Sequence, residues 1–396
     1  TELDLPQNIF TLVHFGRSGT GLIHSLIDSH PEVSTLPSIY LSEYFDYSTW
    51  ENITIGGWDS IVDNFISIYD VLFDARSTIP VKSIEAELIS NIGVKEGLTV
   101  MGENKDQFIS LDKKEFRQKL KSLLDHYEEI NQLTFFKLVH IAYEKTLKNF
   151  EYKDIIFYHI HNPDVYSQFN LVQYDQNSSW IMMVREPIQS CESWLRSSFD
   201  NNNYEECVYR IIKMLVEIDN IVYKKSKSIG VRLEDLKKLP QKTIPALCKW
   251  MGIEENENLY QMTMQGKKWW GDPSSQDYKS DGMNPFGYMS IERKIGSIFS
   301  ENDQFILSTL FYPFNVQFGY IKSDLEKFKT DLHKVKPMLD KIFDFEKIIL
   351  NRTNQDKMSM MLSGTYKFFR NILKDRWNTL NEYHTYPNLI KALKID

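Results

Sequence analysis

A short loop near the start of the chain combines glycines with side chains that bind anions. The apolar run 9–15 is followed at once by GRSGTG, residues 16–21, and then by a helical pattern. The first N–H groups of a helix carry partial positive charge, and glycines let the backbone approach a ligand closely. Arg17 adds a planar cation, while Ser18 and Thr20 add hydroxyl donors. The loop is therefore predicted to bind an anion.

Two common phosphate-binding patterns do not fit this loop. The nucleotide-triphosphate loop needs a lysine and a hydroxyl after its last glycine, and Leu22 and Ile23 stand at those positions. The dinucleotide pattern G-x-G-x-x-G is half present from Gly19 onward, but His24 replaces its last glycine. The alternative without a ligand is a tight turn capped by glycines, which the arginine inside the turn disfavours. The predicted ligand is an anion other than a metal-bound triphosphate.

A second anion site is predicted where the apolar run 180–185 (WIMMVR) ends. Arg185 would stand at the end of this strand, and Pro187 would open the next helix. Ser193 follows Arg185 by eight residues, about two helical turns, so that both could face one group. The alternative is a surface ion pair between Arg185 and a glutamate of the same segment, which contributes little.

Alternating strands and helices are predicted to position these loops. The predicted strands are 9–15, 98–104, 154–162, 180–185 and 230–233. Helices are predicted at about 20–29, within 50–96 and 111–150, at 187–195 and 204–225, and from 322 onward, with a long loop at 265–289. This order predicts an α/β fold with a parallel sheet that is covered by helices on both faces.

Composition limits the partners and the location. A chain of 396 residues with 42% hydrophobic residues can bury a sizeable core, and its net charge of −8 argues against a nucleic-acid partner. No apolar run is long enough to span a membrane. Three cysteines in no metal or disulfide spacing indicate a reducing compartment, so a cytoplasmic location is expected. Because the chain starts at Thr1 rather than Met, a removed leader or anchor stays open.

The first loop resembles a known cofactor-binding loop. GRSGTGLIHSLIDSHPEV, residues 16–33, is similar to the 5′-phosphosulfate loop of sulfotransferases that use 3′-phosphoadenosine 5′-phosphosulfate (PAPS). The match is closest to the tyrosylprotein sulfotransferases and their bacterial relatives, which read P-[KR]-S-G-T-T, then an apolar helix, then HPEV. This chain has Gly16 where that family prefers proline and Gly21 in place of the second threonine, which removes one hydroxyl donor.

The resemblance implies a three-layer, P-loop-like α/β domain with a central parallel sheet. This domain would cover residues 1–322, with helical insertions at about 50–96 and 106–153, and a helical extension would follow over 323–396. The residues implied to bind the 5′-phosphosulfate are Arg17, Ser18, Gly19, Thr20 and Gly21, and those implied to bind the 3′-phosphate are Arg185, Ser193 and Arg293.

Sulfuryl transfer needs positive charge at the bridging oxygen of the donor and a base for the acceptor. Arg17 is the first candidate cation, and Lys105 is the second, because ENKDQF resembles the stretch that carries the catalytic lysine of the tyrosylprotein relatives. Glu43 and His161 are the candidate bases, by resemblance to the carbohydrate and tyrosine branches and to the cytosolic branch respectively. His161 is slightly favoured, since an ordinary histidine pKa suits base chemistry at neutral pH. Each has the alternative of an ordinary surface or hydrogen-bonded side chain.

The predicted reaction moves the sulfuryl group of PAPS to an acceptor hydroxyl or amine by in-line transfer and leaves adenosine 3′,5′-bisphosphate. No metal is expected, because the H-x-H at 159–161 lacks a following ligand pattern. Two alternatives are a divergent P-loop kinase-like nucleotide-binding protein and a non-catalytic nucleotide-binding scaffold. The acceptor is left open among a carbohydrate, a small alcohol, a lipid and a peptide tyrosine. The apolar stripe beyond Lys322 could pack on its own domain or form a homo-oligomer.

Overall fold

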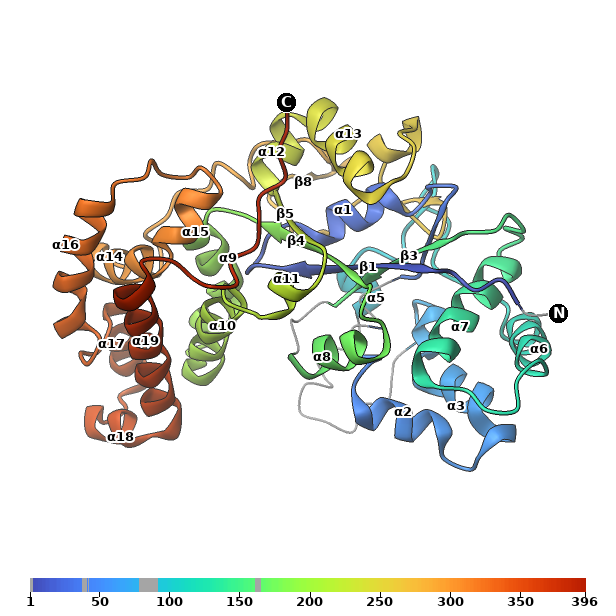
Figure 1. Cartoon of the computed structure of the whole chain (residues 1–396), viewed down its shortest axis with the longest axis horizontal. Helices are drawn as coiled ribbons and strands as arrows, with labels where there is room; N and C mark the ends of the chain where they lie inside the picture. The colour runs from blue at the N-terminus through green and yellow to red at the C-terminus, as the bar shows by residue number, and fades with distance from the viewer. Residues whose placement is uncertain (1–2, 38–40, 42, 78–91, 161–164) are drawn as a thin grey trace.

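A five-stranded parallel sheet lies at the centre of the protein (Figure 1). The computed structural model describes residues 3–37, 41, 43–77, 92–160 and 165–396. The strands are β1 (Asn8–His14), β2 (Val33–Thr35), β3 (Ile155–His159), β4 (Ser179–Val184) and β5 (Ser228–Arg232), in the order β2-β3-β1-β4-β5. Leu12 of β1 is in register with His159 of β3 and with Ile181 of β4. The predicted α/β fold class is confirmed.

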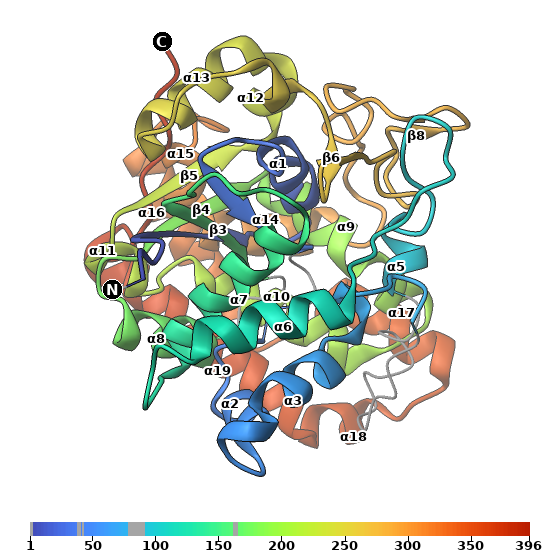
Figure 2. The ribbon, with the colours of Figure 1, turned by 90° about the vertical axis from the view of Figure 1, so that its right-hand side faces the viewer.

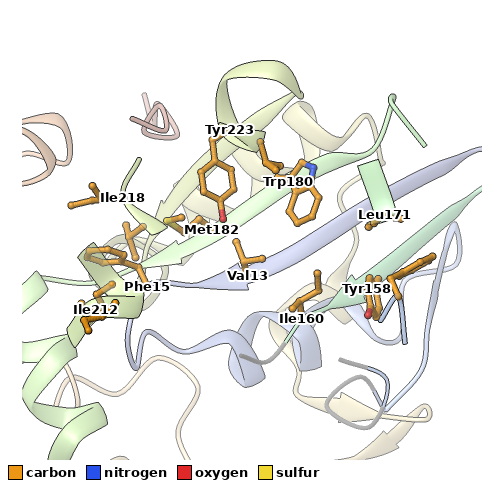
Figure 3. Packing of buried hydrophobic residues seen from close by; sticks show 14 of the residues in the cluster. Val13, Phe15, Tyr158, Ile160, Leu171, Trp180, Met182, Ile212, Ile218 and Tyr223 are labelled. Carbon is orange, nitrogen blue, oxygen red and sulfur yellow. The ribbon is translucent and has the colours of Figure 1, made fainter. Parts of the chain in front are cut away.

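Residues along each strand alternate between hydrophobic clusters on the two faces of the sheet. Phe10 and Leu12 of β1 belong to a cluster with helices α1 (Thr20–Ile27), α12 (Leu233–Lys238) and α13 (Pro240–Met251). Ile9 and Val13 belong to a larger cluster on the other face, with α7 (Gln132–Thr146), α8 (Val165–Tyr174), α9 (Pro187–Asp200) and α10 (Tyr204–Glu217). Figure 3 shows Val13 in this second cluster, near Met182. Burial on both faces explains why the strands read as continuous apolar runs.

Two further groups of helices flank the sheet at its ends (Figure 1). One group contains α2 (Tyr47–Thr54), α3 (Ile61–Ile68) and α6 (Lys113–Leu124), together with α7. The other contains α14 (Glu301–Leu310), α15 (Tyr312–Gln317), α16 (Leu325–Val335), α17 (Asp344–Thr353), α18 (Lys357–Leu362) and α19 (Gly364–Tyr383). The short helices α5 (Ile92–Lys95) and α11 (Val222–Lys225) are the remaining α-helices of the described residues. None of the helices in the described ranges has the length and hydropathy needed to cross a membrane.

The last residues of the chain return to the edge of the sheet. Helix α19 packs on α10, α14 and α16, and the tail that follows it runs beside β5. There, Gly230 donates its N–H to the carbonyl of Lys391 (2.7 Å), and Leu393 donates its N–H to the carbonyl of Gly230 (2.8 Å). The tail therefore covers backbone groups of an edge strand that would otherwise be unpaired.

The predicted strand at 98–104 is wrong, and the sequence did not predict β2. Residues 98–104 form turns and a single bridge between Met101 and Gln107. Gly102, at a φ of 79°, turns the chain, and its N–H is donated to the carbonyl of Lys268 instead of a strand of the sheet. β2 has only three residues, which is too short for a periodic signal.

Two small hairpins lie at and within the predicted long loop at 265–289. The first, β6 (Thr263–Met264) with β7 (Lys267–Lys268), spans its start, and the second is β8 (Tyr278–Lys279) with β9 (Gly282–Met283). Figure 2 shows them beside α1 and the segment that follows α5. Asp28, next to the end of α1, accepts hydrogen bonds from Thr263 Oγ1 and from the N–H of Gly266, both at 2.9 Å. A buried ion pair of 2.7 Å joins Asp277 to Lys237 of α12. This loop is therefore fastened both to the end of α1 and to α12.

Candidate anion-binding site

The loops that follow β1 and β4 lie against each other at the carboxyl edge of the sheet. The hydroxyl of Ser190, in α9, donates to the carbonyl of Phe15 (2.6 Å), and the N–H of Arg17 donates to the carbonyl of Ser190 (3.4 Å). A Cβ added to Gly16, whose φ is 66°, would stand 2.4 Å from Ser190 Oγ. Only glycine fits this backbone conformation and this contact. The two segments predicted to bind anions thus form one continuous surface.

The start of α1 presents backbone donors toward this surface. Gly19 is the N-cap of α1, with φ 85° and ψ 32°, and a Cβ there would meet a leucine of α12 at 2.6 Å. The N–H groups of Thr20, Gly21 and Leu22 stand in the first turn, where a helix supplies no carbonyl partner. Together with the helix dipole, these donors can hold an anion.

Ser18 contributes to the shape of the loop through its hydroxyl. This hydroxyl donates to the carbonyl of Met183 in β4 at 2.7 Å and accepts a hydrogen bond from the N–H of Phe15 at 3.2 Å. Its proton is therefore committed to the protein, and the side chain is buried. The group that Ser18 could offer a ligand in this conformation is its backbone N–H.

Arg185, directly after β4, is 3% exposed. Within the described part of the chain, its guanidinium donates to the carbonyls of Arg17 (3.5 Å) and Ser290 and to the amide oxygen of Gln189 (3.4 Å), and to no carboxylate. Its Nε is buried and has no hydrogen-bond partner among the residues that the structure describes. A buried cation without a paired anion is unfavourable. The arrangement is therefore suited to an anion that comes from outside the protein.

The charges around Arg185 are consistent with this interpretation. Burial lowers the pKa of Arg185 to about 10. Glu234 and Glu186 oppose this shift, whereas the positive charges of Arg293 and Arg17 lower the pKa further. Like charges that converge on a buried arginine are typical of a site that binds an anion.

Arg293 reaches the same place from the segment that follows the second hairpin. Its guanidinium donates to Ser193 Oγ of α9 at 3.2 Å. Burial lowers the pKa of Arg293, Arg196 and Arg17 lower it as well, and Glu192 opposes them. The structure thus brings Arg17, Arg185, Ser193 and Arg293 together, although they are far apart in the sequence.

Arg17 has a different environment. Its side chain is 46% exposed and pairs with Asp272 at 3.3 Å, and it also donates to the hydroxyl of Ser274. The turn that carries these partners is closed by hydrogen bonds of 2.7 Å from the N–H and hydroxyl of Ser274 to Asp272. The charge that Arg17 could offer a ligand is therefore already compensated by the long loop.

Two carboxylates near Arg17 were missed from the sequence. One is Asp272, and the other is Glu96, whose backbone carbonyl accepts a hydrogen bond from Trp269 Nε1 at 2.7 Å. Burial raises the pKa of Glu96 to about 7, Asp272 adds to this rise, and Arg17 opposes it. No motif marks Glu96, and only the folding of the long loop at 265–289 onto α1 brings it here.

The three other predicted catalytic residues have separate outcomes. Lys105 is exposed on a turn, with a φ of 58°, so its predicted place at the end of a strand is wrong. Its Nζ lies 3.4 Å from the carbonyl of Ser280 and 4.5 Å from the ring centroid of Trp270. Trp270 is two residues before Asp272, the ion-pair partner of Arg17. Glu43 is exposed; burial raises the pKa of Tyr69, and the charge of Glu43 raises it further. His161 lies outside the described residues.

The described residues contain no group of three or more histidine, cysteine, aspartate or glutamate side chains that could hold a metal ion. Leu22 and Ile23, which occupy the positions of the lysine and hydroxyl of a triphosphate loop, are buried in the cluster around α1. Their side chains therefore face the core and not the open side of the loop.

No protein-family model and no curated protein matches this chain. Among solved structures, it is similar to the sulfotransferase domain of the Synechococcus PCC 7002 olefin synthase, with 17% identity and a TM-score of 0.38 over 79% of this chain and 97% of that one. It is also similar to the sulfotransferase domain from the curacin biosynthetic pathway, with 13% identity and a TM-score of 0.28 over 89% and 99% of the two chains. For the sulfotransferase STF1 from Mycobacterium tuberculosis H37Rv, the identity is 15% and the TM-score 0.28 over 65% and 70%. At such scores, a function has to be inferred from the residues of the site.

Proposed function

We propose that this protein is a sulfotransferase that moves the sulfuryl group of PAPS to an acceptor hydroxyl or amine. The observation that carries the proposal is the pairing of two anion-binding features on one surface. One is the open first turn of α1, and the other is the buried Arg185, which no carboxylate pairs in the described part of the chain. The resemblance of residues 16–33 to a 5′-phosphosulfate loop supports the same ligand.

In this proposal, the two features bind opposite ends of the donor. The N–H groups of Thr20, Gly21 and Leu22, with Arg17, would hold the 5′-phosphosulfate. Arg185, Ser193 and Arg293 would hold the 3′-phosphate, which ATP lacks. Hydrogen bonds to charged groups contribute about 1.5–3 kcal/mol each, so that a few are enough for micromolar affinity.

The chemical step is an in-line displacement at sulfur. The acceptor oxygen or nitrogen forms a bond to sulfur while the bond from sulfur to the bridging oxygen breaks, and adenosine 3′,5′-bisphosphate leaves with the electron pair. Arg17 and Lys105 are the proposed cations for the charge that develops on this oxygen. The acceptor proton passes to a base, for which Glu43 and His161 remain the candidates from the sequence.

The kinase-like alternative has less support from the site. A triphosphate loop uses a lysine and a hydroxyl to hold the terminal phosphate and Mg²⁺. Here, the corresponding Leu22 and Ile23 are buried in the hydrophobic core. Neither side chain could perform those roles without leaving that core.

Calorimetric titration with three nucleotides tests the proposal. Adenosine 3′,5′-bisphosphate is expected to bind more tightly than AMP, which lacks the 3′-phosphate, and more tightly than Mg-ATP. Incubation with ³⁵S-labelled PAPS and a panel of sugars, alcohols, lipids and tyrosine peptides would then identify the acceptor. Tighter binding of Mg-ATP would contradict the proposal and favour the kinase-like alternative.

A further inference from the structure

One buried carboxylate fastens the segment 290–299, which carries Arg293, to helix α9. Glu192 is 1% exposed, and its two oxygens accept hydrogen bonds from the backbone N–H groups of residues 296–299 at 2.9–3.4 Å. The hydroxyl of Ser297 adds another at 3.0 Å. Four successive backbone donors thus converge on one side chain, which leaves this part of the segment little freedom to move.

The other end of the same segment is also fixed. Ser290 accepts a hydrogen bond from Arg185 through its carbonyl and donates its hydroxyl to Asp277 at 2.6 Å. Asp277 is itself held by its buried ion pair with Lys237. Arg293 lies between these two anchors, so that its backbone is fixed on both sides.

The anchor and the contact made by Arg293 belong to neighbouring residues of one helix. Glu192 binds the segment, and Ser193, the next residue, accepts the hydrogen bond from Arg293 at 3.2 Å. Any movement of the segment away from Glu192 would therefore also separate Arg293 from Ser193.

We propose that Glu192 is a positioning residue for the 3′-phosphate end of the site. It holds the segment 290–299 on α9, so that Arg293 stands beside Ser193 before a ligand arrives. This inference rests on the proposed function, because it assigns a 3′-phosphate to Arg293. A preorganised cation strengthens binding, since the segment does not have to be ordered when the ligand binds.

The test compares two ligands that differ only in the 3′-phosphate. The ratio of the Kd for AMP to the Kd for adenosine 3′,5′-bisphosphate measures the contribution of that phosphate. Glu192→Gln removes the charge and places an N–H₂ group among the backbone donors. We expect this variant to lower the ratio by about tenfold, with the Kd for AMP within twofold of that of the native protein.

Asp303 offers a matched control for the loss of a buried carboxylate. It is 1% exposed and accepts hydrogen bonds from the N–H groups of Asp344 and Phe345, both at 2.9 Å, at the start of α17. Asp303→Asn removes the same kind of anchor from a part of the fold without a proposed ligand contact. It is expected to lower the melting temperature and to leave the ratio of the two Kd values unchanged.

A double-mutant cycle separates positioning from a general loss of structure. If Glu192 acts through Arg293, then Glu192→Gln changes the ratio less than twofold in a protein that already carries Arg293→Ala. Should Glu192→Gln fail to fold, Gly296→Ala takes its place. Gly296 is exposed at a φ of 99°, a conformation that alanine rarely adopts, so this change displaces the bound backbone without altering the core.

The outcomes are distinct for the two proposals. A native ratio near one, with no preference for the 3′-phosphate, would remove the proposed function and this inference with it. A high native ratio that Glu192→Gln or Gly296→Ala leaves within twofold would overturn the role of Glu192 alone. That role is also overturned if Glu192→Gln lowers the ratio equally with and without Arg293.

Discussion

Arg17 and Arg185, in the loops that follow β1 and β4, differ in which protein groups already neutralise their charge. Arg185 is 3% exposed, and its described hydrogen bonds all end on carbonyl or amide oxygens. Arg17 has a side chain that is 46% exposed, and it is paired with Asp272. In the described part of the chain, one end of the site therefore holds a buried charge without a hydrogen-bonded carboxylate, whereas the other end holds a charge that the long loop pairs.

This difference separates two tasks of the site. Binding an anion beside Arg185 stabilises a desolvated charge and, among the described residues, displaces no carboxylate from its guanidinium, so this end should supply most of the affinity. At Arg17, a ligand has to compete with Asp272, and the loop gains its binding strength from backbone N–H groups instead. We therefore expect side-chain charge to determine the affinity at the end that contains Arg185, and backbone conformation to determine it at the end that contains Arg17.

The largest expected effect is that of Arg185→Met. Loss of a buried charged partner should weaken the binding of adenosine 3′,5′-bisphosphate by at least about 30-fold, equivalent to about 2 kcal/mol. The melting temperature should stay the same or rise, because an apolar side chain removes an unpaired buried charge. Calorimetric titration and thermal unfolding measure the two effects.

Arg17→Met is the matched control for this change. Its effect on the same affinity should be at most about fivefold, since an exposed ion pair contributes about 0.2–1 kcal/mol. An Arg17 variant that loses as much affinity as the Arg185 variant would erase the distinction between the two ends.

Two glycines test whether backbone shape governs the 5′ end. Gly19→Ala forces alanine to a φ of 85° and into contact with α12, so AMP and adenosine 3′,5′-bisphosphate should both bind about tenfold more weakly. Gly21→Ala should be tolerated, because among the described residues its Cβ would meet only Trp269, at 3.7 Å. Urea unfolding and titration of each variant provide the check. Equal effects of the two changes would argue against a role for the αL turn.

Asp272→Asn should change the affinity at the Arg17 end in the opposite direction, toward tighter binding. Without the carboxylate, Arg17 is free to meet a ligand, and both nucleotides should bind about two- to fivefold more tightly, as expected from the modest strength of an exposed ion pair. Ser274→Ala removes a neutral partner of Arg17 and serves as the control in the same titrations. Weaker binding by Asp272→Asn would show that the pair supports the site instead of competing with its ligand.

The smallest effect is a pH dependence caused by Glu96. With a pKa of about 7, this carboxyl is mostly protonated at pH 6 and mostly ionised at pH 8. The negative charge that appears near Asp272 and Arg17 opposes an incoming anion, so binding should weaken by up to about threefold over this range, relative to Glu96→Gln. Since the ligand also titrates, the difference between the two proteins is the quantity to measure. Identical pH profiles of the native protein and of Glu96→Gln would show that Glu96 does not affect ligand binding.

The parts of the site that sequence analysis predicted are those built from local signals. Arg17 and Arg185 each follow an apolar strand and precede a helix, so their place at one edge of the sheet follows from the parallel topology. Gly19 was assigned to the loop because it also lies between the first apolar strand and the helix that follows it. The alternation of strands and helices was enough to predict the fold class.

What the sequence did not reveal depends on contacts between distant segments. Asp272 pairs with Arg17, and Glu96 comes close enough to feel its charge, only because the long loop folds onto α1, and Glu192 binds a segment more than 100 residues away. The apolar run 98–104 was misassigned because Leu98 and Met101 are buried in the cluster around α1 and the same loop without strand pairing, whereas Val100 is exposed. Neither periodicity nor motif spacing carries such information.

A crystal structure of the complex with adenosine 3′,5′-bisphosphate tests the central claim most directly. We expect the 3′-phosphate in contact with the guanidinium of Arg185 and with Ser193, and the 5′-phosphate over the first turn of α1. A bound nucleotide that leaves Arg185 donating only to protein carbonyls, or that lies away from the start of α1, would contradict it.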